Sequence, residues 1–68
     1  MSKPSWDDAP PWAAYLAQDS DGEWFWYSEK PNLPAGKSGW VDEIGSLYAW
    51  ARKTPNYESF RLTLERRP

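Results

Sequence analysis

Cysteine and histidine are both absent from this 68-residue chain. Their absence excludes disulfides, thiolate nucleophiles, imidazole acid-base chemistry and the usual structural zinc sites. The serine and threonine hydroxyls have no histidine to activate them, and no glycine-rich phosphate loop is present. We therefore expect neither an enzyme nor a bound metal or cofactor. A domain this small that folds without disulfides also suggests a cytoplasmic protein.

Long apolar runs are missing too. No stretch approaches the roughly 20 apolar residues of a membrane span, and the residues after Met1 do not lead into the apolar core of a signal peptide. Asp19 and Asp21 open a segment that resembles a calcium loop, but Lys30 stands where the loop would need its last glutamate. We interpret that segment as a turn and expect no membrane partner.

Aliphatic side chains are scarce, whereas the chain has six Trp, four Tyr and two Phe. A domain of this size buries only about 60% of the surface that its unfolded chain exposes, so its core must be rich for its length. Each ring can bury roughly 150–250 Å². Most rings must therefore belong to the core, and only one or two are expected to be surface anchors.

Four large rings stand in a row at residues 24–27. In a strand, Trp24 and Trp26 would point to one face of the sheet, and Phe25 and Tyr27 to the other. So short a chain has little material with which to cover two aromatic faces. We expect one of these faces to be left for a partner.

The pattern predicts a mainly β fold, a small antiparallel meander of three or four strands. The Asp-Gly turn at residues 19–22 predicts a hairpin of 13–18 with 23–28. We favour it over a helix through 12–17 that residues 8–11 would cap and open. Residues 31–39 read as a loop that returns the chain to a third strand at Trp40-Val41. Residues 60–64 alternate apolar and polar, which predicts a last short strand or an extended segment laid across the sheet.

Two regions stay ambiguous or irregular. Residues 44–53 have both helical spacing and strand alternation, so one short helix remains an alternative to a strand there. Residues 1–11 carry three prolines and predict a flexible or extended arm, in which Trp6 is the residue with a reason to dock. Residues 12–68 then form a single small domain, with the chain ends folded over one face of the sheet.

The net charge of −2 is too small and of the wrong sign for phosphate-driven DNA binding. The charged residues are also distributed unevenly along the chain. Acidic residues concentrate in the first half and basic residues near the end. Either the two ends attract each other, or they form a polar footprint on a partner. The residues concerned are Asp7, Asp8, Asp19, Asp21, Glu23 and Glu29 in the first half and Arg52, Lys53, Arg61, Arg66 and Arg67 near the end.

Protein recognition fits this composition best, because Trp, Tyr and Arg dominate interface hot spots. We expect a partner-binding surface among the rings and one arginine. Single-stranded nucleic-acid binding is an alternative that has the stacking rings but lacks a basic groove. A self-associating structural or assembly protein, such as a homodimer, is a further alternative. The candidate partner-binding residues are Trp24, Phe25, Trp26, Tyr27, Trp40, Trp50 and Arg52.

Both ends of the chain resemble a group of small tryptophan-rich proteins of bacteriophages and prophages. The first stretch comprises three pieces: Trp6-Asp7-Asp8-Ala9-Pro10-Pro11-Trp12-Ala13, residues 17–27 and Lys30-Pro31. The second, residues 60–68, is similar to a Trp-Arg-x-Ser-Leu-x-x-Arg-Pro ending, with Phe60 and Thr63 as departures. The resemblance leaves residues 32–56 unmatched. The resemblance implies a phage or prophage origin and a location in the cytoplasm of a bacterial host. We therefore expect the partner to be a host protein, which this chain would inhibit during host takeover or to counter host defence.

Trp12, the central aromatic strand and Trp40 also resemble the WW domain, a three-stranded binder of proline-rich peptides. In that family the second Trp is followed by x-x-Pro, whereas Val41-Asp42-Glu43 follows Trp40 here. The spacing between the two Trp residues is also long. We therefore do not transfer the WW ligand site to this chain.

Overall fold

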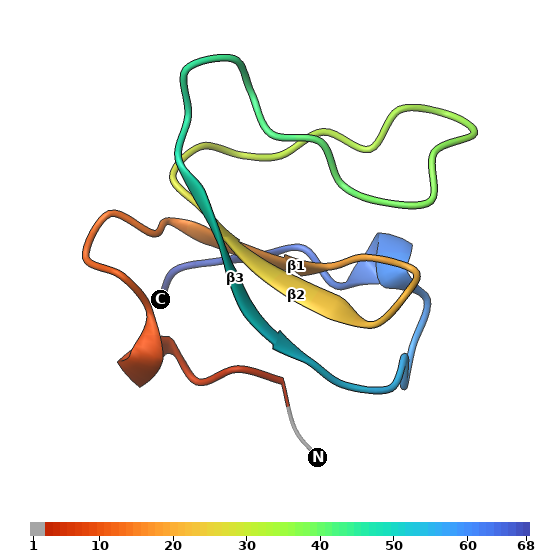
Figure 1. Cartoon of the computed structure of the whole chain (residues 1–68), viewed down its shortest axis with the longest axis horizontal. Helices are drawn as coiled ribbons and strands as arrows, with labels where there is room; N and C mark the ends of the chain where they lie inside the picture. The colour runs from red at the N-terminus through yellow and green to blue at the C-terminus, as the bar shows by residue number, and fades with distance from the viewer. Residues whose placement is uncertain (1–2) are drawn as a thin grey trace.

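A computed structural model describes residues 3–68, which form one four-stranded antiparallel sheet (Figure 1). The strands are β1 (Tyr15–Gln18), β2 (Glu23–Tyr27), β3 (Tyr48–Lys53) and β4 (Glu65–Arg66), in the spatial order β3-β2-β1-β4. Two short 3-10 helices, η1 (Trp6–Asp8) and η2 (Phe60–Leu62), complete the fold. The predicted mainly β, antiparallel fold is confirmed.

The hairpin predicted from the Asp-Gly turn is present as β1 and β2, which are the two central strands of the sheet. Tyr15 pairs with Tyr27 at the open end and Gln18 with Trp24 next to the turn. Gly22 closes the turn at a φ of +94°, and its N–H donates to the Asp19 carbonyl oxygen at 3.0 Å. Glycine adopts this backbone conformation without the steric cost that a Cβ would add.

Residues 44–53 contain a strand, not a helix. β3 pairs with β2 along its whole length, from Tyr27 with Tyr48 to Glu23 with Lys53. A helix would have left one edge of β2 without hydrogen-bond partners and its rings without neighbours. The strand alternative is therefore confirmed for 48–53, where sequence spacing alone left both open.

Two strand predictions are wrong. Trp40-Val41 forms no strand, because Asn32 and Val41 make only an isolated bridge with two backbone hydrogen bonds of 2.8 Å. The prolines at 31 and 34 have no N–H to extend that ladder. Residues 60–62 form η2, and the last strand lies at Glu65–Arg66.

The sheet has two different faces. The core face carries Leu16, Gln18, Trp24 and Trp26, all of them buried. The N-terminal arm covers it, with the Trp6 and Trp26 ring centroids 5.0 Å apart. The predicted docking of Trp6 is therefore confirmed.

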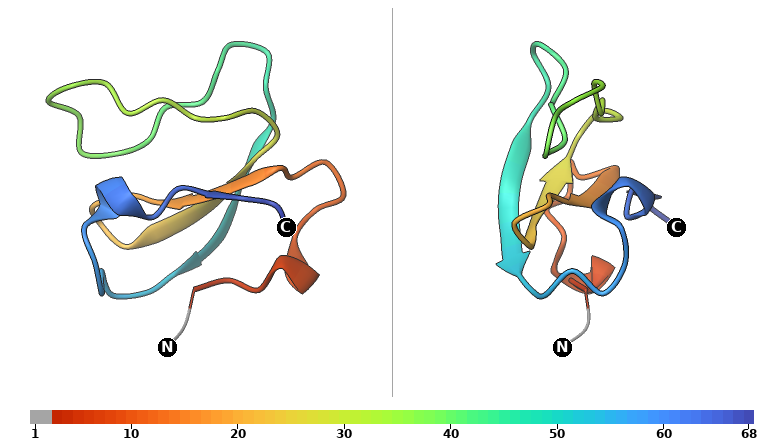
Figure 2. Two further views of the ribbon diagram at one scale, coloured as in Figure 1. Left: turned by 180° about the vertical axis from the view of Figure 1, so that it is seen from behind. Right: turned by 90° about the vertical axis from the view of Figure 1, so that its right-hand side faces the viewer.

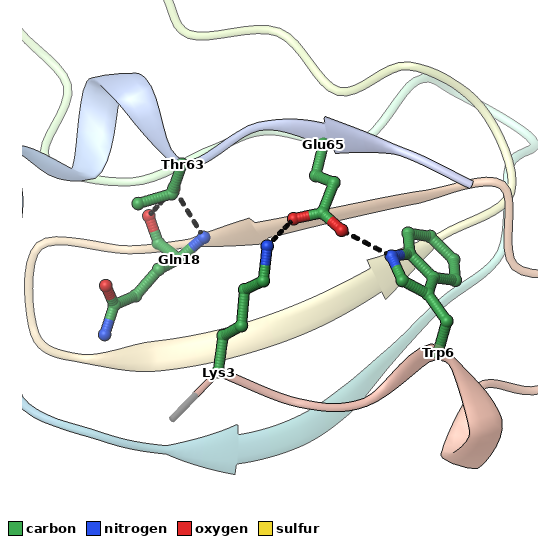
Figure 3. Close-up of polar contacts among 5 residues, drawn as sticks. All are labelled: Lys3, Trp6, Gln18, Thr63 and Glu65. Carbon is green, nitrogen blue, oxygen red and sulfur yellow. Dashed lines mark hydrogen bonds and ion pairs between the residues drawn. The ribbon is translucent and has the colours of Figure 1, made fainter. Parts of the chain in front are cut away.

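Gln18 is a polar member of the core face, with only 1% of its surface exposed. Its side-chain amide donates to the carbonyl oxygens of Gly22 and Thr54, both at 3.1 Å. Its backbone N–H donates to the Thr63 hydroxyl at 2.9 Å (Figure 3). Because these bonds satisfy the side-chain NH2 group, it can be buried at little cost. They also tie the β1–β2 turn to the end of β3 and to the C-terminal segment.

The two chain ends meet, but not as acidic front against basic tail. Glu65 accepts hydrogen bonds from the Lys3 ammonium and from the Trp6 indole N–H (Figure 3). Arg67 donates to the Ala13 carbonyl oxygen at 2.7 Å and to that of Pro10 at 3.1 Å. The ion pair thus joins a basic residue of the arm to an acidic residue of the tail.

The contact between the ends predicts a pH dependence. Burial by itself would raise the pKa of Glu65, but the hydrogen bonds from Lys3 and Trp6 and the Lys3 charge outweigh it, so the pKa lies below its ordinary 4.5. A lowered folded-state pKa means that the carboxylate stabilises the fold above about pH 4.5 and that this contribution is lost as the pH falls through the lowered value.

Glu65→Gln is therefore expected to lower the free energy of unfolding at pH 7, by no more than about 1 kcal/mol because the pair is partly exposed. The difference between the two proteins should shrink as the pH falls below about 4.5. Urea denaturation between pH 3 and 7 measures this, with Glu58→Gln as an exposed control. A difference that stays constant over this range would contradict a charge effect.

Candidate functional site

Three of the predicted partner-binding residues lie in the interior. Trp24, Trp26 and Tyr27 are 6%, 3% and 3% exposed. The Trp24 indole N–H donates to the Thr54 hydroxyl at 2.8 Å, so even its polar atom is used inside the fold. These three rings hold the sheet together, and no more than 6% of any of them is exposed.

Trp50 is the predicted ring that lies at the surface. It is 58% exposed on β3, and Tyr48, two residues earlier on the same face, is also 58% exposed. The Trp50 indole N–H donates to the Glu23 carboxylate at 2.8 Å across the sheet, which fixes how the ring lies. Sequence reasoning did not single out Tyr48, although its alternation with Ala49 and Trp50 was the available signal.

A β-bulge divides β3. Phe25 pairs with Trp50 and Trp24 pairs with Arg52, so Ala51 lies between the two pairs without a partner on β2. In a regular strand Trp50 and Arg52 would share a face, but the bulge places Arg52 on the core face with Trp24. The structure therefore separates these two predicted binding residues.

β3 is also an edge strand, because it lies at one end of the sheet order. In the side view of Figure 2 it runs along one margin of the molecule, with the C-terminal segment at the opposite margin. Its outward backbone groups have no strand partner within residues 3–68. An edge of this kind is a template for another strand.

A groove flanks β3 on the side of the core face. Its volume is about 410 Å³, and Arg52 contributes the positive charge and Asp8 the negative charge to its lining. Arg52 is half-buried there. The groove is lined by Pro4, Asp8, Pro10, Trp26, Ala49, Trp50, Ala51 and Arg52.

A second hollow lies over the opposite face, which we call the aromatic face, between the sheet and the loop of residues 28–47. This aromatic-acidic pocket has a volume of about 210 Å³ and is lined by Asp19, Phe25, Tyr27, Trp40, Asp42 and Tyr48. The Phe25 ring centroid lies 6.2 Å from that of Tyr48 and 6.4 Å from that of Tyr27. Phe25 and Trp40 are half-buried, so the pocket joins two further predicted residues.

Trp40 positions the loop wall of this pocket. Its backbone N–H donates to the Asp19 carboxylate at 2.9 Å, and its indole N–H donates to the carbonyl oxygens of Gln18 and Phe60 at 3.1 and 3.2 Å. These bonds hold the end of β1, the start of η2 and the loop of residues 28–47 around the Trp40 ring. Trp40 is thus a structural anchor as well as a wall of the pocket.

The charged side chains that line the pocket, Asp19 and Asp42, are both acidic. Burial raises the pKa of Asp19 above its ordinary 3.8, although the Trp40 N–H opposes this, and the charges of Asp21 and Glu23 raise it further. Burial also raises the pKa of the Tyr27 hydroxyl, helped by the charges of Asp19 and Asp42. No arrangement of three His, Cys, Asp or Glu side chains that could hold a metal ion occurs among the described residues.

No protein-family model, curated protein or solved structure matches this chain. The part of the chain that the structure describes contains no helix long and apolar enough to cross a membrane.

Proposed function

We propose that this protein is a non-enzymatic interaction module of phage origin that binds a bacterial host protein along β3 and modulates or inhibits it. The observation that carries this proposal is the exposure of Tyr48 and Trp50 on an edge strand. Large rings that stay at the surface of so small a protein, next to unpaired backbone groups, are typical of binding sites.

The surroundings of β3 support strand addition as the mode of binding. A partner segment paired to the open edge would gain backbone hydrogen bonds, and its side chains would alternate between the two faces of the sheet. One face offers the groove at Arg52 and the other offers Tyr48, Trp50 and the aromatic-acidic pocket. Hollows on both sides of an edge strand give such a segment places for successive side chains.

The proposal predicts that Tyr48→Ala and Trp50→Ala weaken partner binding. The immobilised protein is incubated with a bacterial lysate, and the captured host protein is identified and then titrated by calorimetry. Each substitution is expected to weaken binding at least about tenfold, because interface hot-spot rings contribute about 2 kcal/mol or more. Leu62→Ala is the matched control, since Leu62 is 73% exposed but lies on η2.

Three outcomes would contradict the proposal. The first is a host protein that binds the Tyr48 and Trp50 variants as tightly as the original chain while these variants remain folded. The second is capture that depends on single-stranded nucleic acid and disappears after nuclease treatment, which would favour the nucleic-acid alternative. The third is concentration-dependent sedimentation abolished by Trp50→Ala without a host partner, which would favour self-association through the β3 edge.

A further inference from the structure

The aromatic-acidic pocket combines two kinds of group that attract the same ligand. The faces of Phe25, Tyr27, Trp40 and Tyr48 carry the negative part of a ring quadrupole, and Asp19 and Asp42 carry full negative charges. A cation over such rings gains cation–π attraction, and a nearby carboxylate adds a charge-assisted hydrogen bond. An anion would be repelled by both.

No Lys or Arg of residues 3–68 lines this pocket. The ion pair found within residues 3–68 is Lys3 with Glu65, and it lies with the chain ends. Neither Asp19 nor Asp42 forms an ion pair in the described part of the chain. The raised pKa of Asp19 is the consequence, because partial burial and the neighbouring charges of Asp21 and Glu23 are not offset by a positive charge.

The size of the pocket limits what it can hold. Its 210 Å³ is several times the roughly 30 Å³ that a water molecule occupies, yet below the roughly 300–1,000 Å³ typical of small-molecule and cofactor sites. One side-chain head group fits this range. The pocket also adjoins Tyr48, so a protein segment bound along β3 would lie beside it.

We propose that the aromatic-acidic pocket receives the guanidinium group of an arginine side chain from the partner protein. Arginine suits it better than lysine, because the planar guanidinium stacks on rings, binds a carboxylate through two N–H groups and loses less hydration. This inference rests on the proposed function and deepens it by specifying the chemistry of the partner. Asp42 is the group expected to pair with the guanidinium, since Asp19 already accepts the Trp40 N–H.

The test uses N-acetyl-arginine-amide as a probe for the full chain, followed by NMR. The arginine probe is expected to shift the signals of the Trp40 indole N–H and of the Asp42 backbone amide. The citrulline analogue, which has nearly the same shape but no charge, should leave them unchanged. Asp42→Asn should weaken the arginine probe at least about fivefold. Asp8→Asn, which removes a carboxylate from the other groove, should leave its binding unchanged.

Several results would overturn this assignment. They are equal shifts from arginine and citrulline, tighter binding of N-acetyl-lysine-amide, an unchanged affinity in Asp42→Asn, or an equal loss in Asp8→Asn. Because the probe assay needs no partner, it can fail while Tyr48 and Trp50 still bind a host protein. Equally, the pocket can bind arginine even if no host protein is captured, so the two failures are distinguishable.

Discussion

Trp26→Ala is expected to unfold the protein. Trp26 is 3% exposed at the centre of the core face and packs on Trp6. Truncating a buried Trp to alanine costs about 3–5 kcal/mol, and losing the ring contact adds roughly 0.5–1.5 kcal/mol. A domain of 68 residues has a total stability of only about 3–10 kcal/mol at 0.05–0.15 kcal/mol per residue. The loss is therefore comparable to the whole stability.

Urea denaturation followed by tryptophan fluorescence and near-UV circular dichroism measures this effect. The variant should show no cooperative transition, or one close to zero denaturant. Trp50→Ala is the matched control, because it removes the same side chain from a position that is 58% exposed and is expected to cost about 1 kcal/mol or less. If Trp26→Ala kept a cooperative transition within 1 kcal/mol of the original chain, the core would have to lie elsewhere.

The central hairpin was predictable because its signals are local. The Asp-Gly turn and the apolar-rich segments on either side of it are enough to predict that β1 pairs with β2. The wrong predictions fall where distant contacts decide the structure. At the C-terminal end, the Thr63 hydroxyl donates to the Phe60 carbonyl oxygen at 2.7 Å and accepts the Gln18 N–H from β1. This contact favours a 3-10 turn at a segment whose alternation predicted a strand.

The candidate site was predictable only in part. Alternation indicates that residues 24–27 place rings on both faces, but it cannot tell which face the rest of the chain covers. The arm decides this, because Trp6 docks on Trp26 and the contacts at Glu65 and Arg67 hold it there. The aromatic-acidic pocket depends further on Asp19 and Asp42, which come together only when the loop folds back.

The residues on which the resemblance to phage tryptophan-rich proteins rests lie at the two ends of the chain. In the structure these end segments contribute to the fold and not to the surface of β3. Trp6 from the first stretch and Arg67 from the second contact each other, with the guanidinium carbon 5.5 Å from the ring centroid. These residues hold the arm on the core face. Tyr48 and Trp50 lie in the unmatched middle of the chain. These end segments therefore serve the fold, whereas the proposed binding surface lies in the middle of the chain.

Gly22→Ala is expected to be the second most damaging substitution. A Cβ at Gly22 would lie 2.4 Å from the Thr54 carbonyl oxygen, a backbone atom that cannot rotate away. The φ of +94° adds about 1–2 kcal/mol of strain for a residue with a side chain, and overpacking adds roughly 1–3 kcal/mol. Any shift that relieved the clash would disturb the Gly22 carbonyl oxygen, which accepts from the Thr54 N–H and the Gln18 amide.

Gly36→Ala separates the two costs, because Gly36 has a similar φ of +81° but nothing within 4 Å of the added Cβ. Gly36→Ala should lower the free energy of unfolding only by the backbone strain. Gly22→Ala is therefore expected to lower it by about 1–3 kcal/mol more than Gly36→Ala does. Urea denaturation of the two variants gives this difference directly. Equal losses would mean that the β1–β2 turn moves away from Thr54 freely. In that case the amide of Gln18 could not be the tie that holds the hairpin to the end of β3.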